Sequence, residues 1–367
     1  MKPTGVTVAG AIGLAVQLAA CGSDSSPVPS GAPITKDAGT PETTPPRDDA
    51  ATDGHASSDG ASGDGGVRDA GSHDCALPNY PTPDCTGAPP GLALTTHEGD
   101  LVIEDPGVYE NLHVTGHVFI CSSDVTLRNS VVNGLGDGMA INTRDYPCDS
   151  RLRENVLVED VTIEPTDFDL PATDWAMYES DGPLGNERWP EIAIGPSGFT
   201  CRRCKIITRD GPRAGTALEG PDVTSANIRI EDSYIFARSD GHEEPCNHTD
   251  GIQGYYGGAN VVLEHVTIDS GTACATGAIF AGDESTSMEV YDSLLMGGGY
   301  TITLGDDPGL VADYKVRDVK IVDGSWGYEP ARCPGAQHLK LWSDVDVVKI
   351  DPVYRVTSTV RNLPSCE

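Results

Sequence analysis

The sequence predicts an all-β protein, a right-handed parallel β-helix of three short parallel sheets and about seven to nine coils, preceded by a disordered tether. Three observations lead to this prediction: a nine-residue pattern that recurs along the chain, a composition rich in turn residues, and an N-terminal stretch with little apolar content. The 367 residues include 43 Gly and 27 Pro, but only 6% are aromatic. Such a composition is typical of many short strands joined by turns.

The recurring pattern is Asn/Asp–apolar–x–apolar–x–Asp/Asn/His–small–x–apolar. Seven copies occupy residues 124–132, 155–163, 198–206, 227–235, 260–268, 287–295 and 313–321, with starts 31, 43, 29, 33, 27 and 26 residues apart. The alternation inside each half is the period of a β-strand. Repetition at this interval indicates supersecondary units stacked on one another.

Each position of the pattern has a structural reason. Positions two and four point inward on one strand, and positions seven and nine point inward on the next. Position six makes a bend, because short polar side chains tolerate the left-handed backbone conformation. We therefore read His265, which holds position six in its copy, as structural.

A third short strand is expected in each interval, which gives three strands per coil. These strands are expected at residues 139–142, 192–195, 216–220, 250–254, 277–281, 301–305 and 339–342. Residues 92–120 would form the first coil or a cap, and residues 345–361 would close the C-terminal end and protect its edge.

The N-terminal part divides into three segments ahead of the β-helix domain at 92–367. Residues 1–20 are expected to be a signal peptide, 21–74 a disordered tether, and 75–91 a disulfide-linked lead-in. The signal ends in Leu18-Ala19-Ala20-Cys21, which resembles the lipobox of bacterial lipoproteins. The resemblance implies a lipid on Cys21, membrane contact through that lipid only, and a place in the bacterial envelope, at the outer membrane or cell surface. A plain secretory signal is the alternative.

Ten cysteines remain besides Cys21, and an even number in an exported chain predicts disulfides. We expect local bridges, which join Cys75 to Cys85, Cys121 to Cys148, Cys246 to Cys274 and Cys333 to Cys366. Cys201 and Cys204 either pair or stay buried and free. A zinc site at these two is disfavoured, because no second CxxC and no CxxH accompanies them.

The charge of the chain bears on its partners. The formal net charge is −32, and residues 75–367 contain 46 acidic and 20 basic side chains. An acidic domain of this kind argues against a nucleic-acid partner. We expect a monomer whose partner is a polysaccharide, either a polyuronate or a neutral glycan.

Four stretches resemble the pectate-lyase-like superfamily, and within it a group of exported bacterial β-helix proteins with an H-x-D-G-I-Q strand. They are "GAPPGLALT" (87–95), "PGVYENLHVTGHVFI" (106–120), "HTDGIQGYYGGANVVLEHVTI" (248–268) and "MGGGYTITLG" (296–305). The resemblance covers about residues 88–330 and implies the β-helix fold, with a saccharide groove on the sheet of third strands. It does not imply one activity, because folds host many functions.

The predicted third strands share a row of mostly small residues that would form a shallow groove floor. This row is Ala140, Ala193, Ala217, Gly251, Ala278, Thr301 and Lys340. Candidate catalytic residues beside it are His248, Asp250 and Glu219. Candidate substrate-binding residues are Gln253, Arg213, Arg238, Lys340, Trp342 and Trp175, whose amide, cationic and aromatic groups suit sugar recognition.

Two reactions fit these residues. A lyase would use His248 or an Arg as the base beside a uronate, and a glycosidase would use Asp250 and Glu219 as its two carboxylates. Calcium is the cofactor considered, because it can bridge an acidic protein and a polyuronate. The alternatives are glycan binding without chemistry and a purely structural β-helix. In the structural reading Asp250 shapes the corner of the strand and Gly251 is present because no side chain fits.

Overall fold

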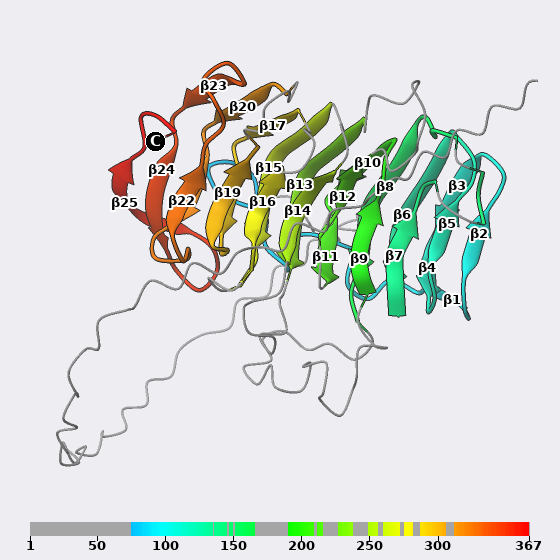
Figure 1. Cartoon of the computed structure of the whole chain (residues 1–367). Helices are drawn as coiled ribbons and strands as arrows, with labels where there is room; N and C mark the ends of the chain where they lie inside the picture. The colour runs from blue at the N-terminus through cyan, green and yellow to red at the C-terminus, as the bar shows by residue number, and fades with distance from the viewer. Residues whose placement is uncertain are drawn as a thin grey trace, which may run out of the picture. The chain divides into compact units, whose positions relative to one another are not determined.

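The computed structural model describes residues 75–134, 136–144, 147–149, 151–165, 190–208, 211–215, 227–237, 249–255, 260–271, 275–281, 287–305 and 312–366. Expectations for residues 1–74, including lipidation of Cys21, lie outside these ranges. In the described ranges the chain forms strands and turns (Figure 1). No helix there has the length and apolar content needed to cross a membrane.

The largest sheet has 16 strands, and almost all of its pairs are parallel. Its strands are β1 (Thr95–His97), β3 (Gly107–Glu110), β4 (Leu112–Val114), β6 (Val125–Val132), β8 (Val156–Ile163), β10 (Phe199–Arg202), β11 (Lys205–Thr208), β13 (Ile228–Ala237), β15 (Val261–Asp269), β17 (Met288–Tyr291), β18 (Leu294–Met296), β20 (Tyr314–Arg317), β21 (Lys320–Val322), β23 (Leu339–Ser343), β24 (Asp346–Ile350) and β25 (Val356–Asn362). The pattern copies supply most of these strands. The prediction of an all-β protein with mostly parallel sheets is confirmed.

The spacing of the copies along the sequence sets the register in which the strands pair. Thr126 lies opposite Leu157, Val156 opposite Phe199, and Thr200 opposite Arg229. Ile228 lies opposite Val261, Val261 opposite Met288, and Met288 opposite Tyr314. Each offset equals the sequence distance between consecutive copies, so equivalent positions of the pattern stack on one another.

Position six adopts the expected left-handed backbone conformation. The φ angles are 51° at Asn129, 52° at Asp160, 49° at Asp232, 55° at His265 and 49° at Asp292. Four strands, β6, β8, β13 and β15, run through this bend without a break. The two faces that were expected as separate sheets are therefore joined into the one large sheet.

Position seven, directly after the bend, holds small residues because space is limited there and because a serine hydroxyl can bond the nearby backbone. The buried hydroxyl of Ser233 accepts a hydrogen bond from Cys204 N at 3.0 Å and donates one to Glu231 O at 2.7 Å. Ser130 and Ser293 make the equivalent pairs of bonds. Each serine satisfies backbone groups that the bend removes from the regular strand ladder.

The third strands form two further parallel sheets. One consists of β2 (Leu101–Ile103), β5 (Val118–Ile120), β7 (Gly136–Asn142) and β9 (Pro190–Gly195). The other consists of β12 (Arg213–Gly215), β14 (Asp250–Tyr255), β16 (Gly277–Ala281), β19 (Tyr300–Leu304) and β22 (Glu329–Arg332). Inward residues of all three sheets, such as Leu127, Ile194 and Ile279, meet in one apolar core.

One predicted third strand is wrong, and another lies outside the described residues. The strand that pairs with β14 is 213–215, and the strand predicted at 216–220 is among the residues that the structure does not describe. The strand that pairs with β19 is 329–332, whereas residues 339–343 pair with β20 in the large sheet. In the last coil the 339–343 segment alternates like any strand, and periodicity alone does not say which sheet a strand joins.

Disulfides join Cys75 to Cys85, Cys121 to Cys148 and Cys333 to Cys366, as predicted, and Cys201 is joined to Cys204. Cys246 and Cys274 lie outside the described residues. At the C-terminal end, β25 pairs with β24 as an antiparallel strand. This hairpin covers the edge of β24, as expected for residues 345–361.

Residues 75–88, which we call the N-terminal strap, pack on the outer face of the large sheet. Tyr80 is buried in a cluster with Leu294 and Val348. Gly87 N donates to Arg203 O at 2.7 Å, and Ala88 N donates to Thr162 Oγ1 at 2.9 Å. The strap is thus part of the folded domain.

Candidate functional site

The residues predicted to form a groove site are only partly described. His248, Glu219, Arg238 and Trp175 lie outside the described residues. Arg213 and Gln253 lie opposite each other on β12 and β14. Since residues 213–215 pair with 253–255, Arg213 takes the place next to Gln253 that was predicted for Glu219.

Lys340 and Trp342 do not lie on the sheet of third strands, so their predicted place in the groove is wrong. Both are on β23 in the large sheet, where Trp342 lies opposite Val316. The Trp342 indole donates from Nε1 to Leu363 O at 2.8 Å, and Lys340 donates from Nζ to Gln337 O at 2.6 Å. Trp342 therefore holds the C-terminal segment in place.

Asp250 and Gly251 form a buried corner. Asp250 is 2% exposed, and its carbonyl accepts a hydrogen bond from Gly211 N at 2.9 Å. A Cβ on Gly251 would lie 2.1 Å from Ile268 Cγ2 and 2.4 Å from Ala278 O, so no side chain fits there. These contacts favour the structural reading for this pair of residues.

The predicted groove floor is not accessible at the described positions that lie on the sheets of third strands. Ala140, Ala193, Ala278 and Thr301 each have no exposed area. On β14 and β16 the outer side chains of Gln253 and Phe280 lie in register and are half-buried. The row of small residues therefore reflects tight packing at these positions rather than an open surface.

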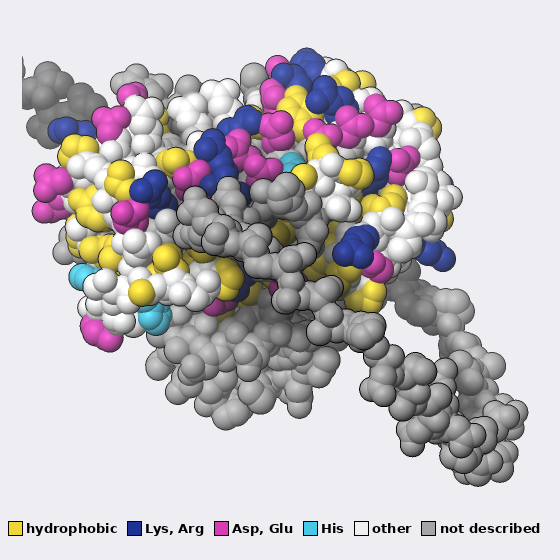
Figure 2. All heavy atoms as spheres, turned by 180° about the vertical axis from the view of Figure 1, so that it is seen from behind, with side chains coloured by type: hydrophobic (Ala, Val, Ile, Leu, Met, Phe, Trp, Pro, Cys, Tyr) yellow, Lys and Arg dark blue, Asp and Glu magenta, His cyan; other side chains and the backbone are white. Residues whose placement is uncertain are grey.

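A row of mostly charged side chains runs along the outer face of the large sheet at position five of the pattern. In order of the strands it contains Glu110, Arg128, Glu159, Arg202, Glu231, Glu264, Tyr291 and Arg317. Together with Arg229, Glu289 and Lys315 at position three, we call this row the charged ladder. Figure 2 shows basic and acidic side chains interspersed on the described surface of the molecule.

The ladder is held together by cross-strand ion pairs. Arg128 pairs with Glu110 at 2.6 Å, and Lys315 pairs with Glu289 at 2.6 Å. Arg202 bonds Glu231, which is the next residue of the row. Opposite charges on facing strands stabilise a sheet modestly, and their hydrogen bonds fix the orientation of each side chain.

Two like charges are adjacent at Glu231 and Glu264, and Arg229 bridges them. Its Nε donates to Glu231 Oε2 at 2.6 Å, and its Nη2 donates to Glu264. Burial acts to raise the pKa of Glu231, but hydrogen bonds from Arg229 and Arg202 outweigh it and hold that pKa below its usual value. The carboxylate is therefore kept ionised.

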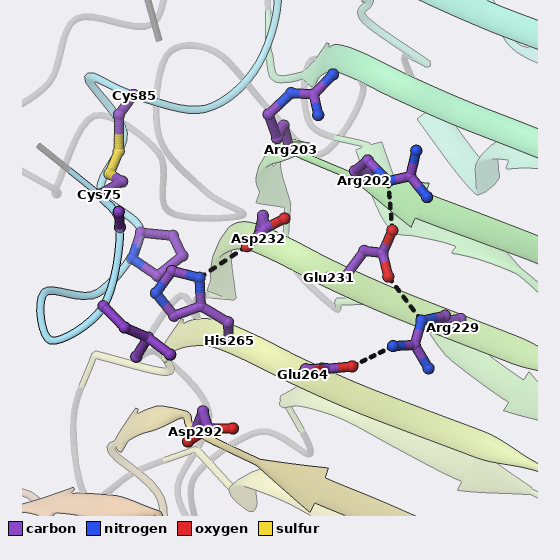
Figure 3. A pocket seen from close by; sticks show the side chains of 13 residues that line it. Cys75, Cys85, Arg202, Arg203, Arg229, Glu231, Asp232, Glu264, His265 and Asp292 are labelled. Atoms are coloured by element: carbon purple, nitrogen blue, oxygen red, sulfur yellow. Dashed lines mark hydrogen bonds and ion pairs between the residues drawn. A yellow bond between two sulfur atoms is a disulfide. The ribbon is translucent and has the colours of Figure 1, made fainter. Parts of the chain in front are cut away.

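A cavity of about 540 Å³ lies between the ladder and the N-terminal strap (Figure 3). The sheet side contributes Arg202, Arg203, Arg229, Glu231, Asp232, Glu264, His265 and Asp292. The strap side contributes Cys75, Ala76, Leu77, Pro81 and Cys85. One wall is thus charged and the other mainly apolar, and residues far apart in sequence meet here because the strap crosses the stacked bends.

His265 joins the two walls. Its Nδ1 lies 2.7 Å from Asp232 Oδ1, and its Nε2 lies 3.0 Å from Asn79 O in the strap. A carbonyl and an ionised carboxylate only accept hydrogen bonds, so both contacts are satisfied when both ring nitrogens carry protons. Burial acts to lower the pKa of His265, but the bonds to Asp232 and Asn79 outweigh it and raise that pKa.

The bond to His265 has the complementary effect on its partner, because it lowers the pKa of the Asp232 carboxyl. The prediction that His265 is a structural bend residue agrees with its φ and its buried ring. The contact with the strap could not be predicted from the repeat. The signal for this contact in the sequence was the single His at position six, where the other copies have Asp, Asn or, once, Arg.

Each of three arginines at the cavity keeps one terminal nitrogen that bonds no other residue in the described part of the chain. Arg203 uses Nε and Nη2 for Asp160, at 2.7 Å each. Arg202 uses Nε and Nη1, and Arg229 uses Nε and Nη2. The remaining nitrogens, Nη1 of Arg203 and Arg229 and Nη2 of Arg202, are donors available to a ligand.

The ladder could have been predicted from the sequence by aligning position five of the copies, where Arg and Glu alternate in the first four. Metal binding receives no support at this site, since no group of three or more His, Cys, Asp or Glu in the described ranges is arranged to hold an ion. Calcium dependence stays a prediction.

No protein-family model, no curated protein and no solved structure matches this chain. Its function is therefore inferred from the residues described above.

Proposed function

We propose that this protein is an envelope-anchored right-handed parallel β-helix that binds polysaccharide, with a lipid on Cys21 as its anchor. The observation that carries the proposal is the charged ladder, in which fixed donors and acceptors repeat from strand to strand across eight strands. Neighbouring strands are about 4.8 Å apart. A ligand made of repeating units can contact such a surface at several rungs at once.

The chemistry of the ladder suits sugar hydroxyls. Each hydroxyl both donates and accepts a hydrogen bond, and the ladder offers guanidinium donors beside carboxylate acceptors. The ion pairs hold these groups in place before a ligand arrives, so binding costs less side-chain entropy. Arg317 stacks over the ring of Tyr291 at 4.9 Å, which adds a flat surface at one end of the ladder.

Binding is favoured over cleavage by the burial of Asp250. A carboxylate acting on a glycosidic bond must reach the substrate, and Asp250 is 2% exposed. The second candidate is cleavage in a groove on the β12–β14 sheet, by β-elimination or hydrolysis. It is favoured by the adjacent positions of Arg213 and Gln253, with His248 and Glu219 as its untested partners.

The test is a glycan array probed with the purified full chain, wild type and an Arg128→Gln/Lys315→Gln double variant. These substitutions lie far apart on the ladder and should each remove ionic contacts from a long ligand. We expect wild-type binding to long glycans and a loss of about tenfold or more in the variant. Thr357→Gln, on the exposed strand β25, is the control and should bind like wild type.

The same glycans are then incubated with the protein, with and without calcium, and assayed for unsaturated products at about 235 nm and for new reducing ends. We expect neither product. Cleavage that is lost in His248→Ala would replace binding by catalysis as the function. Absence of binding to any polysaccharide in the array would overturn the proposal.

A further inference from the structure

We propose that the cavity under the N-terminal strap is a subsite for one or two units of a neutral sugar. This inference rests on the proposed polysaccharide function and names the ligand class of a particular site. The cavity volume of about 540 Å³ lies within the range of small-molecule sites, roughly 300–1,000 Å³. The site is separate from the predicted groove, because it lies on the outer face of the large sheet.

The charged wall can pair with hydroxyl groups without further rearrangement. Arg202, Arg203 and Arg229 each present one unused terminal NH2 group, and their other nitrogens are fixed by carboxylates. Glu264 accepts from Arg229 through Oε2 and keeps its other oxygen for a ligand. The carboxylate of Asp292, which lines the cavity, makes no hydrogen bond within the described residues. Hydroxyls would accept from the arginines and donate to these carboxylates.

The charge balance selects a neutral ligand. The lining contains three arginines and a histidine whose two contacts call for a second proton, against four carboxylates. A uronate or phosphate would add negative charge beside Glu231, Glu264 and Asp292, in a chain that is strongly acidic overall. A cationic ligand would meet three guanidinium groups. Either charge would be opposed by groups already in place.

The strap wall suits the apolar face of a sugar ring. It is formed by the Cys75–Cys85 disulfide, Ala76, Leu77 and Pro81. Leu77 is 55% exposed, although its neighbour Tyr80 in the strap is buried. A large apolar side chain exposed at the edge of a polar cavity is available to cover the C–H groups of a bound ring.

The experiment measures binding of short saccharides to the full chain by isothermal titration. The neutral probes are maltose, cellobiose, lactose and mannobiose, and the charged probes are digalacturonate and chitosan dimer. We expect a neutral disaccharide to bind and both charged probes to bind at least about tenfold more weakly. The variants are Arg229→Gln and Leu77→Ser, which alter opposite walls of the cavity.

Each variant should weaken the neutral disaccharide by about tenfold, since each removes one contact of the kind worth about 1.4 kcal/mol. Lys320→Gln is the matched control. It removes an ion pair with Asp346 that lies outside both the ladder and the cavity lining, and it should leave disaccharide binding unchanged. Leu77 is exposed, so Leu77→Ser tests the site without a large effect on folding, and urea unfolding of each variant checks this.

The outcomes separate this inference from the proposed function. If long glycans bind but the two cavity variants leave disaccharide binding at the wild-type level, the cavity assignment is wrong and the ladder proposal stands. If digalacturonate or the chitosan dimer binds more tightly than every neutral probe, the ligand class is wrong. If neither long glycans nor disaccharides bind, both proposals fail.

Discussion

Replacing His265 with Asn should weaken the attachment of the N-terminal strap in a pH-dependent manner. Asn already occupies the same bend position at Asn129, with a φ of 51°, so the substitution keeps a residue suited to the bend and removes the imidazole. The ring bonds Asn79 O at 3.0 Å and Asp232 at 2.7 Å. Hydrogen bonds that involve a charged group contribute about 1.5–3 kcal/mol each.

The two hydrogen bonds of the His265 ring should not contribute equally to the free energy of unfolding. The side chain of Asp232 is 52% exposed, and an ion pair open to solvent contributes roughly 0–1 kcal/mol. The bond to Asn79 is the main loss, together with the packing of Tyr80 against the ring, whose centroids are 6.4 Å apart. We expect a decrease of about 2 kcal/mol in the free energy of unfolding at pH 6.

The sign of the pH dependence follows from the raised pKa of His265. A raised folded-state pKa contributes stability that is complete below the unfolded value of about 6.5. That stability is lost as the pH rises through the folded pKa. The difference between wild type and His265→Asn should therefore be largest at about pH 6 and smaller at about pH 8.5.

Urea unfolding followed by tyrosine and tryptophan fluorescence at both pH values measures this difference. The carboxyl of Asp232, whose pKa is lowered by its bond to the ring, stays ionised across this window and does not contribute to the difference. His97→Gln is the control, because the His97 ring bonds Asp100 O away from the strap. A difference between wild type and His265→Asn that is the same at both pH values would refute the assignment of two protons to this ring.

Three further predictions concern the fold, and urea unfolding measures each. Gly251→Ala should lower the free energy of unfolding by about 1–3 kcal/mol, because the new Cβ meets Ala278 O at 2.4 Å. An unchanged free energy of unfolding would show that the backbone at this corner can move to make room for the methyl group. Ser233→Ala should cost about 1–3 kcal/mol by leaving Cys204 N without its acceptor, whereas Ser358→Ala, at an exposed position of β25, is the control. The double replacement Cys333→Ser/Cys366→Ser should cost about 3–4 kcal/mol, because the bridge closes a loop with a sequence separation of 33; an unchanged unfolding midpoint would contradict that estimate.

The large sheet was predictable from the sequence because its information is local and repeated. Apolar alternation sets which side chains point inward, and the polar residue at position six sets the bend. The distance between copies then fixes the register, as the pairing of Thr126 with Leu157 illustrates. Three of the four predicted disulfides follow from the same local reasoning, since their cysteines are close in sequence.

The third strands were harder to predict because their intervals vary in length and lack the marker residues of the main pattern. Residues 213–215 and 329–332 carry the sequences Arg-Ala-Gly and Glu-Pro-Ala-Arg, which have weak strand character, yet both pair in the structure. Stacking on the neighbouring rung decides these strands more than their own propensity. The weak sequence signal of the third strands is also the reason why Lys340 and Trp342 were predicted on the wrong sheet.

The cavity could not be predicted for a different reason. It requires the strap, 75–88, to lie against strands about 120 to 210 residues later in the chain, and no repeat or spacing records that contact. The contact itself has a physical consequence for binding. A ligand that touches both Arg229 and Leu77 bridges the sheet and the strap, so it binds only when the strap is attached.

Ligand binding and strap attachment are therefore linked, and each should stabilise the other. Protonation of His265 should be linked to the same two events, because the second proton of its ring is needed for the bond to Asn79 in the strap. Acidic conditions that protonate His265 should then favour both the attached strap and the occupied cavity. In the proposed envelope protein the strap directly follows the segment predicted to be a tether, so a load on that segment would act first on the residues that close the proposed sugar site.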